Sequence, residues 1–137
     1  MIRSLKKLQM PKTEVYEYAV IRILPKVERE EFLNVGVILY SKRKGYLDMK
    51  VHLDEERLLG FSKELDIDMI KEYLDAWDLV CKGTKDSGPI GQLEMHLRFR
   101  WLTANRSTII QSSKVHPGQC SEPAVMLDQL FQQLVLQ

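Results

Sequence analysis

Three arginines between positions 98 and 106 are the side chains of this sequence best suited to ligand binding. An arginine presents a planar fork of N–H donors that fits the oxygens of a phosphate or a carboxylate. Nearby hydroxyl groups and a histidine could complete such an anion pocket. The predicted ligand-binding residues are Arg98, Arg100, Arg106, Ser107, Thr108 and His116, with His96 close to them in the sequence. The alternative is that the arginines pair with the acidic residues 53–80, where nine acids and three bases give a local charge of −6.

A second pattern pairs His116 with Cys120, four residues later. A cysteine beside a histidine can act as a nucleophile activated by a base. No third residue that would orient the histidine is evident in the sequence. The alternative interpretation is a structured turn with a small buried cysteine.

Carboxylates form the third pattern, and their members are Glu28, Glu30, Glu31 and Asp48. Grouped carboxylates can hold Mg²⁺ or act as an acid and a base, but in a charged connector they are usually solvated. The sequence has no phosphate-binding loop, no glycine-rich dinucleotide motif, and no spacing typical of a zinc site or a serine hydrolase. We therefore predict no catalytic residue, no metal and no cofactor.

Composition indicates an ordinary globular protein, with 45% hydrophobic residues, 28% charged residues and a net charge of +1. Two cysteines that form no CxxC pair favour a reducing cytoplasm over a secreted, disulfide-bonded protein. No apolar run approaches the ~18 residues that a membrane helix needs. Patterning becomes regular near position 15, so we expect a basic N-terminal arm over residues 1–13 and one domain over residues 14–137.

Periodicity indicates the elements that must position these side chains. Strands are predicted over residues 15–24, 34–41 and 46–53, the second with a bulge or close approach at Gly36 and the third with one solvated face. Asp54 and Asp66 are expected to cap two helices, and a third helix should begin at Pro123. The pattern of residues 90–103 favours a helix over a strand. Residues 107–112 are expected to form a strand, and residues 115–118 a turn. The expected class is α+β: a mainly antiparallel sheet of three to four strands packed against three to four helices in a single domain.

Some segments of the sequence resemble a bacterial family catalogued as domain of unknown function 3037. The resemblance covers about residues 14–136, and its most specific parts are EFLNVGVILY and RFRWLTANRSTIIQ. It implies no established activity. Genes of this family are often thought to lie beside genes for HipA-like kinase proteins, so the resemblance implies such a kinase as a partner, by association only. The resemblance marks ten positions as matching the family motifs: Phe32, Asn34, Gly36, Arg98, Trp101, Arg106, Ser107, His116, Gly118 and Cys120.

Three functions follow as expectations. The leading one is a small cytoplasmic, non-catalytic binding or adaptor module. The second is an anion or nucleic-acid binder that uses residues 95–121, which hold four basic residues and no acid. The third is an enzyme acting on a phosphorylated or nucleotide substrate, which requires Arg98, Arg106 and His116, with Glu31 as an optional member, to converge on one pocket. The pattern leaves the oligomeric state open.

Overall fold

The protein is described by a computed structural model that covers residues 13–26, 31–106 and 108–137. The expected N-terminal arm lies outside these residues, apart from Thr13. The strands are β1 (Glu14–Ile23), β2 (Leu33–Ser41), β3 (Tyr46–Val51), β4 (Ile110–Ser112) and β5 (His116–Cys120). The helices are α2 (Glu55–Phe61), α3 (Ile67–Lys82), α4 (Gly88–Gly91), α5 (Met95–Leu102) and α6 (Pro123–Leu134).

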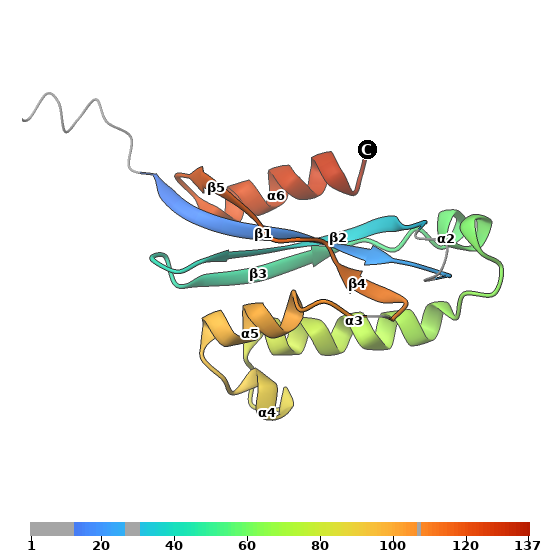
Figure 1. Ribbon diagram of the computed structural model, residues 1–137, viewed down its shortest axis with the longest axis horizontal. Coiled ribbons are helices and arrows are strands. Elements are labelled where there is room, and N and C mark those ends of the chain that lie inside the picture. Colours follow the sequence, from blue (N-terminus) through green and yellow to red (C-terminus); the bar gives the residue numbers. More distant parts are fainter. Residues whose placement is uncertain (1–12, 27–30, 107) are drawn as a thin grey trace, which may run out of the picture.

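One antiparallel sheet contains all five of these strands, in the order β3-β2-β1, with β4 and β5 both pairing with the other side of β1. Helices cover both faces of the sheet (Figure 1): α3 and α5 lie on one face, and α6 lies on the other. We call these the α3 face and the α6 face. The expected α+β class with an antiparallel sheet is confirmed, with one strand more than expected and five helices in the described part of the chain.

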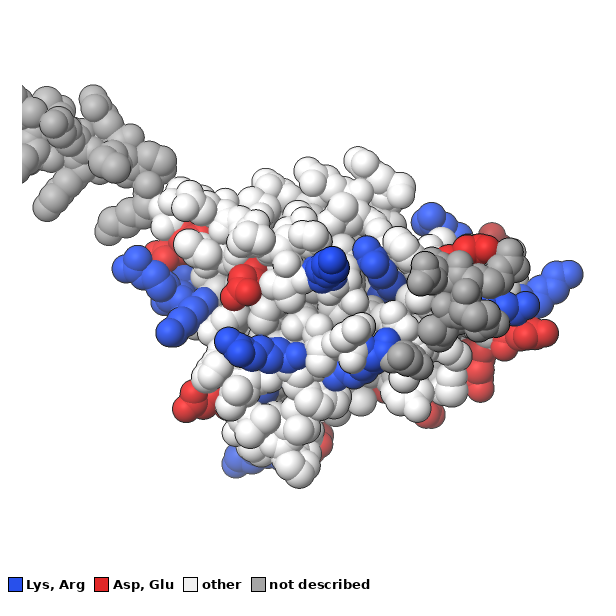
Figure 2. Space-filling model, viewed as in Figure 1, with Lys and Arg blue, Asp and Glu red and all other residues white. Residues whose placement is uncertain are grey.

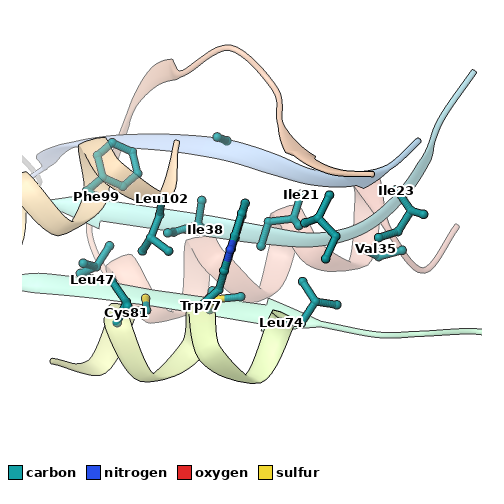
Figure 3. Packing of buried hydrophobic residues seen from close by; sticks show 14 of the residues in the cluster. Ile21, Ile23, Val35, Ile38, Leu47, Leu74, Trp77, Cys81, Phe99 and Leu102 are labelled. Carbon is teal, nitrogen blue, oxygen red and sulfur yellow. The ribbon is translucent and has the colours of Figure 1, made fainter. Parts of the chain in front are cut away.

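The α3 face holds the larger core. Asp66 caps α3 by accepting a hydrogen bond from the backbone N–H of Met69, as its position predicts. The predicted stripe of α3 is then turned toward the sheet, and Ile70, Leu74, Trp77 and Cys81 are all buried. Figure 3 shows Trp77 pointing from α3 toward the sheet, between Ile38 and Ile21.

The α6 face is covered by the C-terminal helix, whose Leu127 and Leu130 are buried. Together with side chains of the sheet they form a second buried cluster under α6, and Tyr46 of β3 packs against it. Lys50 of β3 forms an ion pair with Asp128 of α6 at 2.8 Å. The expectation of a solvated face on the third strand is therefore wrong in part, since α6 returns across the sheet and covers some of it.

Gly36 marks both a bulge and a close approach, as predicted. The pairing of β1 with β2 shifts here, because Ile21 lies opposite Gly36 while Arg22 lies opposite Asn34, leaving Val35 as the extra residue. A Cβ atom at Gly36 would lie 2.7 Å from the carbonyl oxygen of Lys50. Only glycine fits this position without a local shift.

Two predictions for the C-terminal third need correction. Residues 90–103 contain helix, as favoured, but α4 and α5 are separate. Residues 115–118 do not form a turn, because His116 begins β5, which pairs with β1 from Tyr18 back to Glu14. Pro117 and Gly118 are typical turn residues, but both fit this strand at the edge of the sheet, where a missing N–H group costs little.

Candidate functional site

An apolar groove of about 640 Å³ opens beside α3, at the end of α5 and along the segment that enters β4. Aromatic rings dominate it: Trp77 and Tyr73 come from α3 and Trp101 comes from α5. Trp77 is 6% exposed, whereas Trp101 and Tyr73 are 36% and 55% exposed. The chain has only two tryptophans, and both line this groove. Its volume and aromatic lining are typical of ligand-binding sites.

Arg106 is the charged member of the groove lining. The guanidinium carbon lies 4.5 Å from the centre of the Trp101 ring and 5.1 Å from that of Trp77. Nη1 donates to the carbonyl oxygens of Leu102 at 3.2 Å and Ala104 at 3.3 Å, and Nη2 donates to that of Trp101. These carbonyls lie at the end of α5 and just after it, where regular helical hydrogen bonds run out; that of Trp101 also accepts from the backbone N–H of Ala104 at 3.4 Å. Arg106 therefore holds the end of α5 and lies against both tryptophans.

The charge of Arg106 has no acidic counterpart in the described part of the chain, where no ion pair includes this residue. Burial lowers its pKa, yet an arginine side chain stays protonated in proteins. The Nε–H and one Nη2–H make no hydrogen bond to any described residue. A partly desolvated cation without a counterion favours a ligand that brings a negative charge.

Arg98 has a different role at the end of another helix. Its Nη1 donates to the carbonyl oxygen of Leu93 at 2.8 Å, and its guanidinium packs against Gly83, the left-handed residue that ends α3. A cation at this position is favourable, because the helix dipole is negative there. The Nε atom of Arg98 is buried without a partner. This arginine stabilises the junction between α3 and α5.

Arg100 lines a separate cleft of about 560 Å³ on the other side of α5, with Glu17, Tyr40, Lys42 and His96. Its side chain is exposed and makes no hydrogen bond or ion pair with a described residue. The three arginines thus do not converge. The alternative, ion pairing with the acidic residues 53–80, is also wrong, because Arg98 and Arg106 bind backbone carbonyl oxygens instead.

His116 and Cys120 both lie on β5 but do not contact each other. Four residues of strand separate their Cα atoms by about 13 Å. The His116 ring packs on Tyr18, 5.3 Å between centres, while Cys120 is buried in the cluster under α6, where burial raises the pKa of its thiol. The arrangement lacks the contact that a nucleophile and its base require.

His116 also lies far from Arg106. Its partner Tyr18 packs on the α6 face, whereas Arg106 contacts Trp77 on the α3 face. Along β1, His116 pairs with Tyr18 and the groove residue Ile110 pairs with Ile23, which places them about 17 Å apart. The convergence that the enzyme hypothesis requires is not found.

Two members of the predicted carboxylate set, Glu31 and Asp48, lie in the described part of the chain, and Glu31 lines a cleft separate from the groove. Glu28 and Glu30 lie outside the described residues, and Asp48 accepts a hydrogen bond from the backbone N–H of Met49 at 2.8 Å. No group of three His, Cys, Asp or Glu side chains that could hold a metal ion occurs in the described ranges. Likewise, no helix in those ranges is long and apolar enough to cross a membrane.

The remaining predicted residues have visible structural partners. Phe32 lies under the guanidinium of Arg22 at 4.0 Å, and the Asn34 amide donates to the carbonyl oxygen of Leu134 at the end of α6. The ring of Tyr16 covers Gly118 so closely that a Cβ atom there would clash with it. The hydroxyl of Thr108, in the groove lining, donates to the carbonyl oxygen of Ile110. Ser107 lies outside the described residues.

Sequence reasoning missed the α3 side of the groove. Trp77 was assigned to the core stripe, which is correct but incomplete. A second apolar stripe lies beside it, formed by Met69, Tyr73 and Ala76 at spacings of four and three, and all three line the groove. The available signal was that the apolar face of this helix is wider than the stripe that covers the core.

Fold and groove together define the class of this protein: an α+β protein whose antiparallel sheet lies between helical layers and which carries an aromatic groove with one arginine. The chain belongs to the family described as protein of unknown function DUF3037, whose model matches residues 18–135. The resemblance seen in the sequence is thereby confirmed. No curated protein and no solved structure matches the chain.

Proposed function

We propose that the protein is a cytoplasmic, non-catalytic binding module that takes a segment of a partner protein into the groove between α3, α5 and β4. The observation that carries this proposal is the placement of Arg106 against Trp77 and Trp101 at an open apolar groove. Tryptophan and arginine are the residue types most enriched where protein interfaces gain their binding energy. Both cysteines are free thiols, which fits a reducing compartment.

A groove that accepts a partner leaves apolar surface in water when it is empty. Trp101 is part of a surface that folding alone does not require, since more than a third of its area remains exposed. The uncompensated charge of Arg106 adds selectivity, because it disfavours a basic partner and favours an acidic one.

The partner to test first is the HipA-like kinase protein that the family resemblance implies. The two purified proteins are mixed at micromolar concentrations, and binding is measured by calorimetry and size-exclusion chromatography. Trp101→Ala should weaken binding about 30-fold or more, which corresponds to loss of ~2 kcal/mol at a central aromatic contact. Leu97→Ala removes an apolar side chain of similar fractional exposure from the same helix outside the groove, and it should change little.

The outcomes separate the parts of the proposal. Absence of a complex at micromolar concentrations argues against this partner. A complex that Trp101→Ala and Leu97→Ala affect equally argues against the groove as the binding site.

A second candidate function, binding of a nucleic acid or another polyanion, is favoured by a different observation. Figure 2 shows Lys and Arg side chains across the middle of one face of the molecule, with Asp and Glu side chains mainly at its margins. Arg100 is exposed and has no ion-pair partner among the described residues. Contacts to phosphates would release counterions, so repeating the calorimetry with an oligonucleotide at 50 and 200 mM salt tests this function. Weak or salt-independent binding would exclude it.

A further inference from the structure

The open donors of Arg106 indicate what the partner segment carries. Nη1 and one Nη2–H hold the carbonyl oxygens at the end of α5, whereas the Nε–H and the second Nη2–H make no hydrogen bond to a described residue. A guanidinium binds a carboxylate through two parallel N–H···O bonds. Because its position is already fixed by α5 and two indole rings, forming such a pair would cost little side-chain entropy.

A carboxylate suits this site better than a phosphate. Phosphate groups in proteins are usually bound by clusters of arginines, but Arg98 and Arg100 lie at the end of α3 and in a separate cleft. Arg106 is the one basic residue among the described residues that line the groove, and none of them is acidic. A single negative charge on the ligand is therefore matched by one arginine, whereas the second charge of a phosphate would have no partner there.

We infer that the groove recognises an acidic side chain of the partner, Asp or Glu, that is flanked by apolar side chains. The carboxylate pairs with the open edge of Arg106, and the neighbouring apolar groups pack on Trp77, Trp101 and Tyr73. This inference rests on the proposed function and specifies the chemistry of its ligand. The occupant is an internal segment of a protein, held by its side chains.

The two tryptophans make the test direct, because the only two indole N–H signals in the nuclear magnetic resonance spectrum come from the groove. The whole ¹⁵N-labelled chain is titrated with Ac-Leu-Glu-Phe-NH₂, in which the glutamate provides the only carboxylate. The matched probe is Ac-Leu-Gln-Phe-NH₂. We expect the glutamate probe to shift the indole signals and to bind about tenfold more tightly, the effect of one hydrogen-bonded charge.

Two variants locate the effect. Arg106→Gln should remove the preference for glutamate and leave the glutamine probe unaffected. Arg43→Gln is the matched control, because Arg43 is exposed in the turn between β2 and β3, outside the groove, and this variant should retain the full preference. If Arg106→Gln fails to fold because α5 loses its end, the comparison of the two probes with the unaltered protein still decides the question.

Equal binding of the two probes overturns the carboxylate inference and leaves the groove proposal standing. Tighter binding of a third probe with phosphoserine in place of glutamate also overturns it. If no probe shifts the indole signals at millimolar concentration, the groove does not accept apolar segments, and the proposed function fails with the inference.

Discussion

At the scale of single residues, the arginines show how one side-chain type serves different purposes. Arg98 and Arg106 each bind backbone carbonyl oxygens near the end of a helix, while Arg100 is left in the solvent. Of these three arginines, only Arg106 combines this anchoring with contacts to two indole rings, the buried ring of Trp77 and the exposed ring of Trp101. The type and spacing of the residues predicted an anion pocket, but the helix between Met95 and Leu102 points neighbouring arginines in different directions.

Gly36 provides a prediction at the same scale. Gly36→Ala places a methyl group 2.7 Å from a backbone oxygen in the centre of the sheet. The free energy of unfolding should fall by about 1–3 kcal/mol, the usual cost of overpacking. Urea denaturation measures it.

Gly60→Ala is the matched control, because nothing lies within 4 Å of a Cβ atom at that exposed helical position. Alanine favours helix, so this variant should be as stable as the original or more stable. A Gly36→Ala variant as stable as Gly60→Ala would contradict the close approach.

At the scale of elements, both edges of the sheet carry features that discourage a further strand. The N–H of His52 bonds to the carbonyl oxygen of Val35, so that of Met49, three residues earlier, points away from β2. Asp48 accepts this outward N–H with its side chain. On the opposite edge, Pro117 in β5 has no N–H to offer. Such features are common defences against edge-to-edge pairing, and they favour a partner that docks in the groove.

The junction between β4 and β5 gives a prediction at this scale. Ser113 lies between the two strands and is buried, and it binds Val20 of β1 twice: its N–H donates to the carbonyl oxygen, and its hydroxyl accepts from the N–H, both at 2.8 Å. Ser113→Ala leaves a buried N–H without a partner. Stability to urea should fall by about 1–3 kcal/mol.

Ser121→Ala serves as the control, since Ser121 is exposed just after β5. It should change stability by no more than about 0.5 kcal/mol. Two variants of equal stability would show that Ser113 does not hold the strands to β1.

At the scale of the whole molecule, buried neutral groups predict a loss of stability in alkali. Burial raises the pKa of Tyr46 to about 12, and it also raises those of Tyr16 and Tyr40 above the ordinary value of 10.0. The folded state keeps these protons more tightly than the unfolded state. The stabilisation that comes from these neutral tyrosines is therefore complete below pH 10, and that of Tyr46 is lost as the pH rises through 12.

Tyr46→Phe tests this, because it removes the largest of the tyrosine contributions. Relative to each protein's own stability at pH 8, the variant should lose less stability than the original between pH 10 and 12. Denaturant unfolding across this range provides the measurement. Parallel curves for the two proteins would show that Tyr46 does not contribute.

Sequence patterning predicted the elements that depend on local signals and left out those that depend on long-range pairing. The caps at Asp54 and Asp66, the core stripe of α3 and the glycine of β2 all follow from neighbouring residues. β5 could not be predicted in this way, because residues His116 to Cys120 form a strand only through their pairing with β1. The groove was out of reach for the same reason: Trp77 and Trp101 lie 24 positions apart, and nothing local shows that their rings meet around one arginine.

The bulge in β2 determines where this strand could change its length during evolution. Before the bulge, Leu33 and Val35 pack on the α3 face and Asn34 binds α6. After it, Ile38 and Tyr40 pack on the α3 face, and Val37 packs on the α6 face. Loss of Val35 would therefore restore regular alternation and leave every other side chain on its present face, with Asn34 next to Gly36 and the register with β1 intact. Deletion of Val37 instead would move the side chains at one end of the strand to the opposite faces of the sheet. Length variation in related chains should be concentrated at this single position.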